Sequence, residues 1–583
     1  MNAVYGVVAV LAVTIATIGI GAFGLRFSRT TSDFYVASRS VSPVWNASAI
    51  GGEYLSAASF LGVAGLILAF GADMLWFPVG YTAGYLVMLV LVAAPLRRSG
   101  AYTLPDFAEA RLESRPVRRI ASVLVVLIGW LYLLPQLEGA GLTLHTVTGA
   151  PAWSGGALVA FVVILNVISG GMRSITFVQA FQYWLKLTAI CLPVIFLLLA
   201  WQGDGRPSPA DEARPTFHQA TTVDVGRTIT VRVDTPVVVR VDGVIDDLRH
   251  DEGTSVALTR GTHVIRSGTT LDFDAGDEVP HVAEISAASH GDWLLPLSGA
   301  GGRDHPLLAT YSLVLATFFG TMGLPHVLVR FYTNPDGRAA RRTTLIVLVL
   351  LSAFYLMPTI YGALGRLYAP DLLLTGRTDA AVLLLPGRLV GGALGDLLGA
   401  LVTAGAFAAF LSTSSGLAVS VAGVLSQDLL RGSVRDFRLA TGLAIIVPLA
   451  LSTLAAALSV ATVVGLAFAV AASSFCPLLV LGIWWRRLTD VGAAAGLLVG
   501  GGLATAAVVT TIVMGPQSGW LGTLLAQPAA LTVPVAFAVM VLVSLLTPRR
   551  VARDVARTMV RLHAPESVQL DRGDFHPERR RRP

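Results

Sequence analysis

The sequence has little charge for its length. Of its 583 residues, 13% are charged and 54% are hydrophobic, and the mean hydropathy is +0.69. Soluble domains carry about a quarter charged residues, so the composition argues against a large soluble enzyme. It favours a polytopic membrane protein. The formal net charge of +6 is too small and too dispersed to indicate a nucleic-acid partner.

Cysteine, lysine and catalytic motifs are also scarce. The two cysteines, Cys191 and Cys476, lie in apolar runs without metal-ligating neighbours, which excludes a disulfide scaffold. Lys186 is the single lysine. There is no P-loop, so an ATP-driven pump is excluded. No apolar run carries a Ser–His pair or a His/Asp cluster, and we expect neither an enzyme nor a cofactor.

Long apolar runs are abundant. About 20 apolar residues are needed to cross the hydrocarbon core as a helix. By that measure the sequence predicts about thirteen transmembrane helices, at about 3–25, 43–70, 74–96, 118–145, 153–170, 175–201, 307–329, 343–365, 390–426, 439–459, 461–485, 491–514 and 528–547. The first run lacks a basic leader and a cleavage site, which indicates a retained helix.

Arginines concentrate in one set of alternate loops. By the positive-inside rule these loops are cytoplasmic, the N-terminus is outside and the C-terminus is inside. An odd number of spans gives the same orientation. The arginines are Arg26, Arg29, Arg39, Arg97, Arg98, Arg111, Arg115, Arg118, Arg119, Arg173, Arg330, Arg338, Arg341, Arg342, Arg431, Arg435, Arg438, Arg486 and Arg487.

One long outside loop separates the sixth and seventh spans. Residues 202–306 hold 17 Asp and Glu against 9 Arg, and their apolar residues alternate with period two. We predict a small β-rich extracytoplasmic domain there, between transmembrane residues 1–201 and 307–547. Its acidic run near 271–278 lacks the spacing of a calcium loop and reads as a solvated turn. The Arg-rich tail 548–583 is expected to be cytoplasmic, and disordered or lying along anionic lipid.

The middle of the second span contains an unusual polar group. Gly51, Gly52 and Glu53 are followed by Tyr54 and two serines. A Gly-Gly pair before a carboxylate favours an unwound helix whose carbonyls face a cation. Close packing of helices through small residues is the alternative. The ninth span adds four consecutive hydroxyls at 412–415, which suit a small hard cation unless they bond back to their own helix.

The sixth and seventh spans place basic groups in the bilayer. Lys186 could pair with Glu53 or Glu138, stand in for a cation, or snorkel towards the interface. His326 follows Gly323 and Pro325, which suggests a second broken helix. A lone histidine is more often a bonded structural residue than a ligand.

Six ordered motifs resemble one family. "DFYVASRSVSP", "AIGGEYLSAASFLG", "SGAYTLPDFAEARL", "LYLLPQLEGAGLTL", "FGTMGLPHVLVRFYT" and "LSQDL" are similar to the sodium:solute symporter family, in its cation/acetate (monocarboxylate) branch. The resemblance covers spans one to eleven. It implies an all-α membrane protein of leucine-transporter-like fold, in which spans two to six and seven to eleven form inverted five-helix repeats.

The resemblance also implies a cation site. Carbonyl oxygens of the broken second span and hydroxyls of the ninth would bind sodium, through Gly52, Leu55, Ala409, Ser412 and Thr413. Gln179 stands where some members use an Asp for a second sodium, so a second site is not expected. Lys186 and Glu53 are candidates for coupling, and Lys186 raises proton coupling as an alternative.

The implied activity is symport of a short monocarboxylate, such as acetate, propionate or pyruvate, in a bacterial plasma membrane. The substrate would lie beside the cation. Its candidate ligands are Tyr54, Ser56, Gln136, Thr321, Gly323 and His326. Proline, pantothenate or a sugar are alternative substrates. A membrane sensor is a further alternative, although the short tail leaves no room for a signalling domain.

Overall fold

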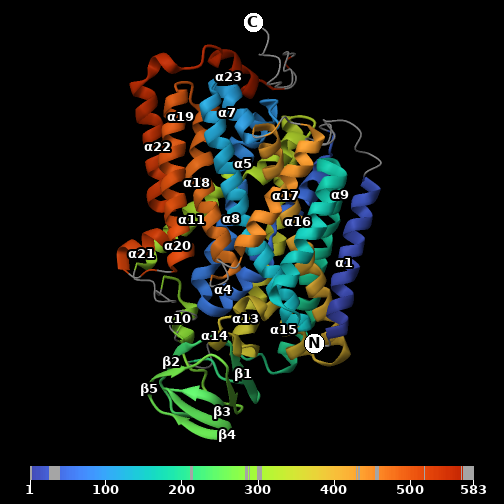
Figure 1. Ribbon diagram of the computed structural model, residues 1–583, viewed down its shortest axis with the longest axis vertical. Coiled ribbons are helices and arrows are strands. Elements are labelled where there is room, and N and C mark those ends of the chain that lie inside the picture. The colour runs from blue at the N-terminus through green and yellow to red at the C-terminus, as the bar shows by residue number, and fades with distance from the viewer. Residues whose placement is uncertain are drawn as a thin grey trace.

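A computed structural model describes residues 3–24, 40–209, 214–282, 287, 289–297, 305–428, 430, 433–452, 458–515, 517, 519–565 and 568. Figure 1 shows a helical bundle that carries a small sheet at one end. The start of α1 (Ala3–Gly24) lies at the sheet end, whereas α23 (Val555–His563) lies at the opposite end. The predicted cytoplasmic arginines Arg26, Arg29, Arg39 and Arg431, and the tail beyond 568, lie outside the described residues.

The first half of the bundle has two long helices and several shorter ones. They are α3 (Pro43–Tyr54), the π-helix η3 (Ala58–Gly62), α4 (Val63–Phe70), η4 (Gly71–Leu75), α5 (Trp76–Leu91), α6 (Ala93–Arg98), α7 (Leu104–Leu112), α8 (Arg115–Thr148) and α9 (Ala152–Gly203).

The second half begins after the sheet. Its elements are α10 (His290–Leu294), α11 (Pro306–Gly323), α12 (Pro325–Val329), η5 (Arg330–Thr333), α13 (Gly337–Tyr368), α14 (Asp371–Thr375), η6 (Thr378–Ala380), α15 (Ala381–Leu385), η7 (Pro386–Val390), α16 (Gly392–Asp428), α17 (Val434–Leu451), α18 (Val460–Trp484), α19 (Asp490–Gly496), η9 (Leu497–Gly501), α20 (Gly502–Met514), α21 (Gly519–Ala526), α22 (Ala529–Leu546) and η10 (Pro548–Arg550).

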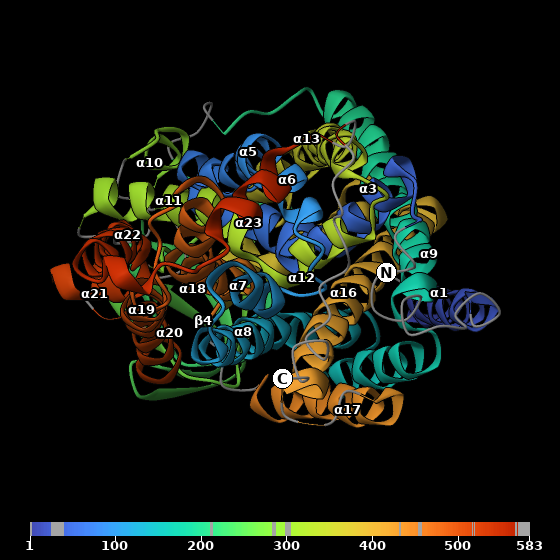
Figure 2. The ribbon, with the colours of Figure 1, turned by 90° about the horizontal axis from the view of Figure 1, so that it is seen from above.

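The described residues contain ten helical stretches long and apolar enough to cross a membrane. The predicted count of thirteen therefore stays a prediction. The first part of α9 contributes only the shorter apolar stretch Ala152–Ile168, and α17 begins with charged residues. Viewed along the bundle, α12 lies near the middle, while α1, α17 and α21 lie at the rim (Figure 2). α16 is buried over most of its length, which makes it the central scaffold.

Six antiparallel strands form the sheet within the predicted insertion. They are β1 (Thr221–Val225), β2 (Ile229–Val233), β3 (Val237–Ile245), β4 (Leu248–Leu258), β5 (Gly261–Ile265) and β6 (Thr269–Phe273). The order is β1-β6-β3-β5-β2, and β4 pairs with β3. Alternate residues of β2 and β3 are buried, as the period-two pattern indicates. Their core includes Leu374 of α14, so the sheet packs directly on the bundle.

The end of the insertion is anchored on the bundle. The Trp293 indole donates to the carbonyls of Ile67 and Leu68, at 2.6 and 3.0 Å. Gly71 lies so close to the backbone of Trp293 that a side chain at 71 would not fit. The buried Arg366 guanidinium lies 6.0 Å from the Trp293 ring. This part of the insertion belongs structurally to α4.

The opposite end holds ordered arginines. Arg118 pairs with Asp106, Glu109 and Asp428 at 2.6–2.8 Å. α23 packs on α6, where Arg98 donates to the carbonyl oxygen of His563 at 3.3 Å. The expectation of disorder is therefore wrong for residues 555–563, which form a helix with Met559 and Leu562 buried, while contact with anionic lipid stays a prediction.

Candidate cation and substrate site

The second predicted span is broken in its middle. α3 ends at Tyr54, Leu55 and Ser56 are not helical, and the chain resumes as η3. Gly51 and Gly52 lie inside α3, against the Tyr183 ring and the Gln179 backbone of α9. The glycine pair therefore serves close packing, and the break falls a few residues later than its position suggests. Carbonyl groups before the break are released from the helix ladder.

The Lys186 ammonium lies against these released carbonyls. It donates to the carbonyl oxygen of Gly52, to that of Leu55 at 2.7 Å, and to the Ser412 hydroxyl at 3.0 Å. Its exposure is 0%, so it does not snorkel to the interface. Its partners are neither Glu53 nor Glu138. Of the three alternatives that the sequence left open for Lys186, this geometry agrees with the one in which its ammonium takes the place of a cation.

The ninth-span hydroxyls divide into two groups. Ser412 Oγ lies 2.6 Å from the Gly52 carbonyl and 3.1 Å from that of Ala409, and Thr413 donates to the Glu53 carbonyl at 2.6 Å. Ser415 bonds back to its own helix at Leu411. The residues predicted for sodium are thus brought together. We name Gly52, Leu55, Ala409, Ser412 and Thr413 the cradle.

A buried ion pair lies beside the cradle. Arg330 donates to Glu53 at 2.7 Å, and both side chains are 1% exposed. Arg330 also bonds to Gln179 and to Thr176, and Gln179 reaches the Ser412 carbonyl at 2.7 Å. The sequence analysis counted Arg330 among the loop arginines, which was wrong. Arg330 lies at the end of a predicted span, and no acidic partner is close to it in the sequence. Neither feature indicates that its side chain is buried.

A second break interrupts the seventh predicted span. α11 ends at Gly323, Leu324 is extended with ψ 114°, and α12 begins at Pro325. Proline lacks the amide hydrogen that would continue the helix. Gly323 lies against the Ala471 carbonyl of α18, where an added Cβ would come within 2.3 Å. We therefore assign Gly323 to packing; it leaves no room for a substrate at its Cα.

The other substrate candidates meet between the two breaks. The Tyr54 and Thr321 hydroxyls are 2.9 Å apart, the Tyr132 hydroxyl lies 3.4 Å from Ser56 Oγ, and Gln136 accepts from the Ala57 amide at 3.0 Å. The His326 ring lies 5.2 Å from the ring of Tyr132. All of these side chains are buried. They come from α3, α8, α11 and α12, so the two breaks share one enclosed environment.

Several polar groups in this environment lack a hydrogen-bond partner among the described residues. They are Gln136 Nε2, both ring nitrogens of His326, and the hydroxyls of Tyr81 and Tyr85. Buried polar groups are otherwise nearly always paired, and each exception calls for an explanation such as an unseen ligand or water. Amide, imidazole and phenol donors suit a small anion.

The aromatic surroundings of this environment were missed by the sequence analysis. Tyr54 packs edge to face on Tyr85 and Phe468, and Tyr81 stacks on Tyr355. The sequence held no signal for this cluster, because its members come from four separate helices. Aromatic rings therefore surround the few polar groups of this environment, a composition common at ligand sites.

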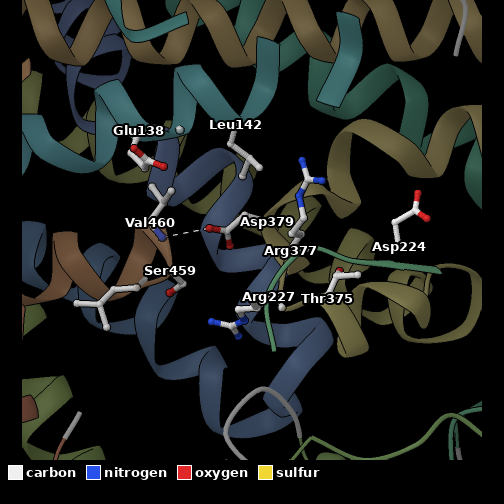
Figure 3. Close-up of a pocket in the computed structure, with 13 residues that line it drawn as sticks. Glu138, Leu142, Asp224, Arg227, Thr375, Arg377, Asp379, Ser459 and Val460 are labelled. Carbon is white, nitrogen blue, oxygen red and sulfur yellow. Dashed lines mark hydrogen bonds between the residues drawn. The ribbon is translucent and has the colours of Figure 1, made fainter. Parts of the chain in front are cut away.

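An outer cavity of about 320 Å³ lies between the sheet and the bundle. Figure 3 shows Glu138, Asp379, Arg227 and Arg377 around it, with Asp379 bonded to the Val460 amide. Gly139, also in its wall, lies beside Ala57 at the first break. Burial raises the pKa of Asp379 to about 6. The cavity therefore begins at the sheet and reaches the level of the broken helix.

Comparison with known proteins identifies the family. The family model "Sodium:solute symporter family" matches residues 34–228 and 277–500. The unmatched interval contains β2 to β6, so most of the sheet is additional to the family pattern. The "Uncharacterized symporter YwcA" of Bacillus subtilis is 29% identical, over 90% of this chain and 91% of its own.

A second relative and one solved structure are also similar. The "Monocarboxylic acid transporter" of Corynebacterium glutamicum is 30% identical, over 88% of this chain and 86% of its own. A sodium-coupled sialic acid symporter in a substrate-bound outward-open state matches with a TM-score of 0.57, at 14% identity, over 93% of this chain and 98% of that one. This structural likeness confirms the transporter fold. The chain is a multi-pass membrane transporter, not an enzyme, and it belongs to the sodium:solute symporter family.

Proposed function

We propose that the protein takes up a short monocarboxylate, such as acetate, propionate or pyruvate, by symport with a cation. Family membership gives cation-coupled solute symport. The observation that carries the substrate class is the set of unpartnered donors at Gln136 and His326 between the two breaks. The relative named as a monocarboxylic acid transporter supports the same class.

A carboxylate suits this environment better than a sugar or an amino acid does. The unpartnered groups are amide, imidazole and hydroxyl donors, and aromatic rings crowd around them. A sugar needs many polar partners on several faces, and proline brings a cationic amine. A small anion with a short apolar tail needs only a few donors and an apolar wall. In alternating access, such an enclosed site opens in turn to each side.

We propose a bacterial plasma-membrane location with the N-terminus outside and the C-terminus inside. The start of α1 and the sheet lie at one end of the bundle, and α23 lies at the other (Figure 1). The arginines of 97–119 lie towards the α23 end, as Arg98 and its contact with His563 indicate. Positively charged residues on that side agree with the positive-inside rule.

Uptake of radiolabelled acetate into proteoliposomes tests the proposal, with sodium and proton gradients imposed separately. We expect accumulation that unlabelled propionate or pyruvate competes away and that proline, pantothenate and glucose leave unchanged. Liposomes without protein correct for passive entry of acetic acid. Gln136→Glu is the matched variant, since it keeps the side-chain shape and adds a negative charge that repels a carboxylate. Competition by proline, pantothenate or glucose instead would reject the substrate class.

A further inference from the structure

The cradle offers the kind of oxygen ligands that a sodium ion needs. Two backbone carbonyls and one hydroxyl converge on a single point, as a small hard cation requires. That point already holds the Lys186 ammonium. An ammonium has three donors and no acceptor. Its three contacts, to Gly52, Leu55 and Ser412, use all three donors, so the side chain is fully satisfied in place.

The cradle leaves no second position for an ion. Ser412 Oγ also lies within 2.6 Å of the Gly52 carbonyl, and Thr413 is engaged with the Glu53 carbonyl. A sodium ion bound to these oxygens would touch the ammonium, and like charges repel strongly at such distances in a buried site. The residues therefore do not fit sodium while Lys186 occupies the cradle.

Charged and polar groups of four helical elements surround Lys186. From α3, Glu53 lies one residue from the Gly52 carbonyl, and its carboxylate is bound by Arg330 of η5. From α16, Ser412 and Thr413 face the cradle. On α9, Gln179 fixes the Ser412 carbonyl, while Gln182 bonds to Thr17 of α1 at 3.1 Å. Arg330 pairs with the Glu53 carboxylate, so Lys186 is held by the neutral carbonyl and hydroxyl oxygens of the cradle.

We infer that the Lys186 side chain permanently replaces the co-transported sodium at this cradle, so that transport does not require sodium there. A tethered cation holds α3 against α16 as a bound ion would, but it cannot leave with the substrate. Only the part of the inference that concerns uptake rests on the proposed symport. Its structural content, that sodium does not bind at the cradle, is tested without any substrate.

Binding of radioactive sodium to the purified full-length protein is the test, with potassium and choline as competitors. We expect no saturable binding in the wild type. Lys186→Ala should create saturable sodium binding, because it frees the same oxygens. In that variant, an added Ser412→Ala should weaken sodium binding about 5- to 150-fold, as the loss of a buried polar partner does. An added Ser415→Ala, which bonds back to its own helix, is the control without effect.

Sodium binding by the wild type tests the inference even if Lys186→Ala fails to fold. Saturable sodium binding by the wild type that Ser412→Ala weakens would overturn the inference, because the ion would share the cradle with Lys186. Sodium binding that Ser412→Ala leaves unchanged comes from another part of the molecule and supports the replacement. The sodium-binding assay contains no carboxylate substrate, so its result does not depend on which solute the protein transports.

Discussion

The two broken helices differ in how their polar groups are satisfied. At the first break, protein groups occupy the released backbone: Lys186 takes the carbonyls of Gly52 and Leu55, and Gln136 takes the amide of Ala57. At the second break, the two ring nitrogens of His326 have no hydrogen-bond partner among the described residues. The released backbone of the first break is therefore satisfied by protein groups, whereas unpartnered side-chain groups remain at His326 and at Gln136 Nε2.

This difference separates the cation site from the substrate site, which the sequence analysis placed side by side. A saturated break can fix the helix without an ion, whereas an unsatisfied one has donors left for a solute. The outer half of the first broken helix is held as well, by Trp293 at its end and by Asp379 of η6, which lies beside Gly65. Each prediction below tests whether the first break is a scaffold and the second a binding site.

The largest effect is expected from breaking the buried ion pair beside the first break. Arg330→Met leaves the Glu53 carboxylate buried and uncompensated, which should cost about 3–5 kcal/mol of stability. Thermal unfolding of the purified protein measures the loss. The double variant Glu53→Gln/Arg330→Met should recover much of it. A double variant that is less stable than Arg330→Met would contradict the pairing.

Removing the anchor at the end of α4 should also cost stability. Trp293→Ala deletes a buried ring and its hydrogen bonds to the Ile67 and Leu68 carbonyls, so we expect a loss of about 3–5 kcal/mol. Replacing residues 217–277 by a short Gly/Ser linker should be milder, because Thr216 and Glu278 are already paired as neighbours. Uptake and thermal unfolding of both variants are compared. Greater damage from losing the sheet would show that it is more than an accessory domain.

The stability of the protein should depend on pH through Asp379 of η6. Burial raises the pKa of this carboxyl from 3.8 to about 6, so its stabilising contribution is full below about pH 4 and is lost as pH rises through about 6. The loss is at most about 3 kcal/mol, at 1.36 kcal/mol per pKa unit. Asp379→Asn cannot ionise and should unfold at a more uniform temperature across this range. An unchanged pH dependence in the variant would place the titrating group elsewhere.

The smallest losses of stability are expected at the unsatisfied groups. His326→Leu should leave folding nearly unchanged, yet raise the KM for acetate about 5- to 150-fold if its donor contacts the carboxylate. Gln136→Leu should raise the KM by a similar factor, but it also strands the buried Ala57 amide and should therefore lower stability as well. Lys186→Met is the contrasting variant, since it strands two carbonyls and should lower stability. Concentration series of acetate uptake and thermal unfolding separate the two outcomes. Equal KM values in the wild type and both Leu variants would remove these residues from the substrate site.

Much of the fold was predictable because its signals are local. Apolar runs gave the helices, Pro325 marked the second break, and alternation in 221–273 gave the strands. The β-rich insertion and the transporter fold follow from these patterns and from the motifs. The exact number of crossings was not predictable, since apolar length alone does not distinguish one long helix from two adjacent ones, as in α9.

The candidate site was predictable in its members but not in its chemistry. The motifs brought Gly52, Leu55 and Ser412 to one place, and Lys186 stood out as the single lysine. Whether that lysine pairs with a carboxylate, snorkels or fills the cradle depends on side-chain direction across three helices. No spacing in the sequence encodes this. The same holds for Arg330, whose partner Glu53 is 277 residues away.

The most direct test of the account is acetate uptake into wild-type proteoliposomes, with sodium on both sides or replaced on both sides by choline. The account predicts the same rate in either cation, and sodium-stimulated uptake only after Lys186→Ala. Uptake by the wild type that stops without sodium, and whose sodium requirement rises in Ser412→Ala, would contradict it.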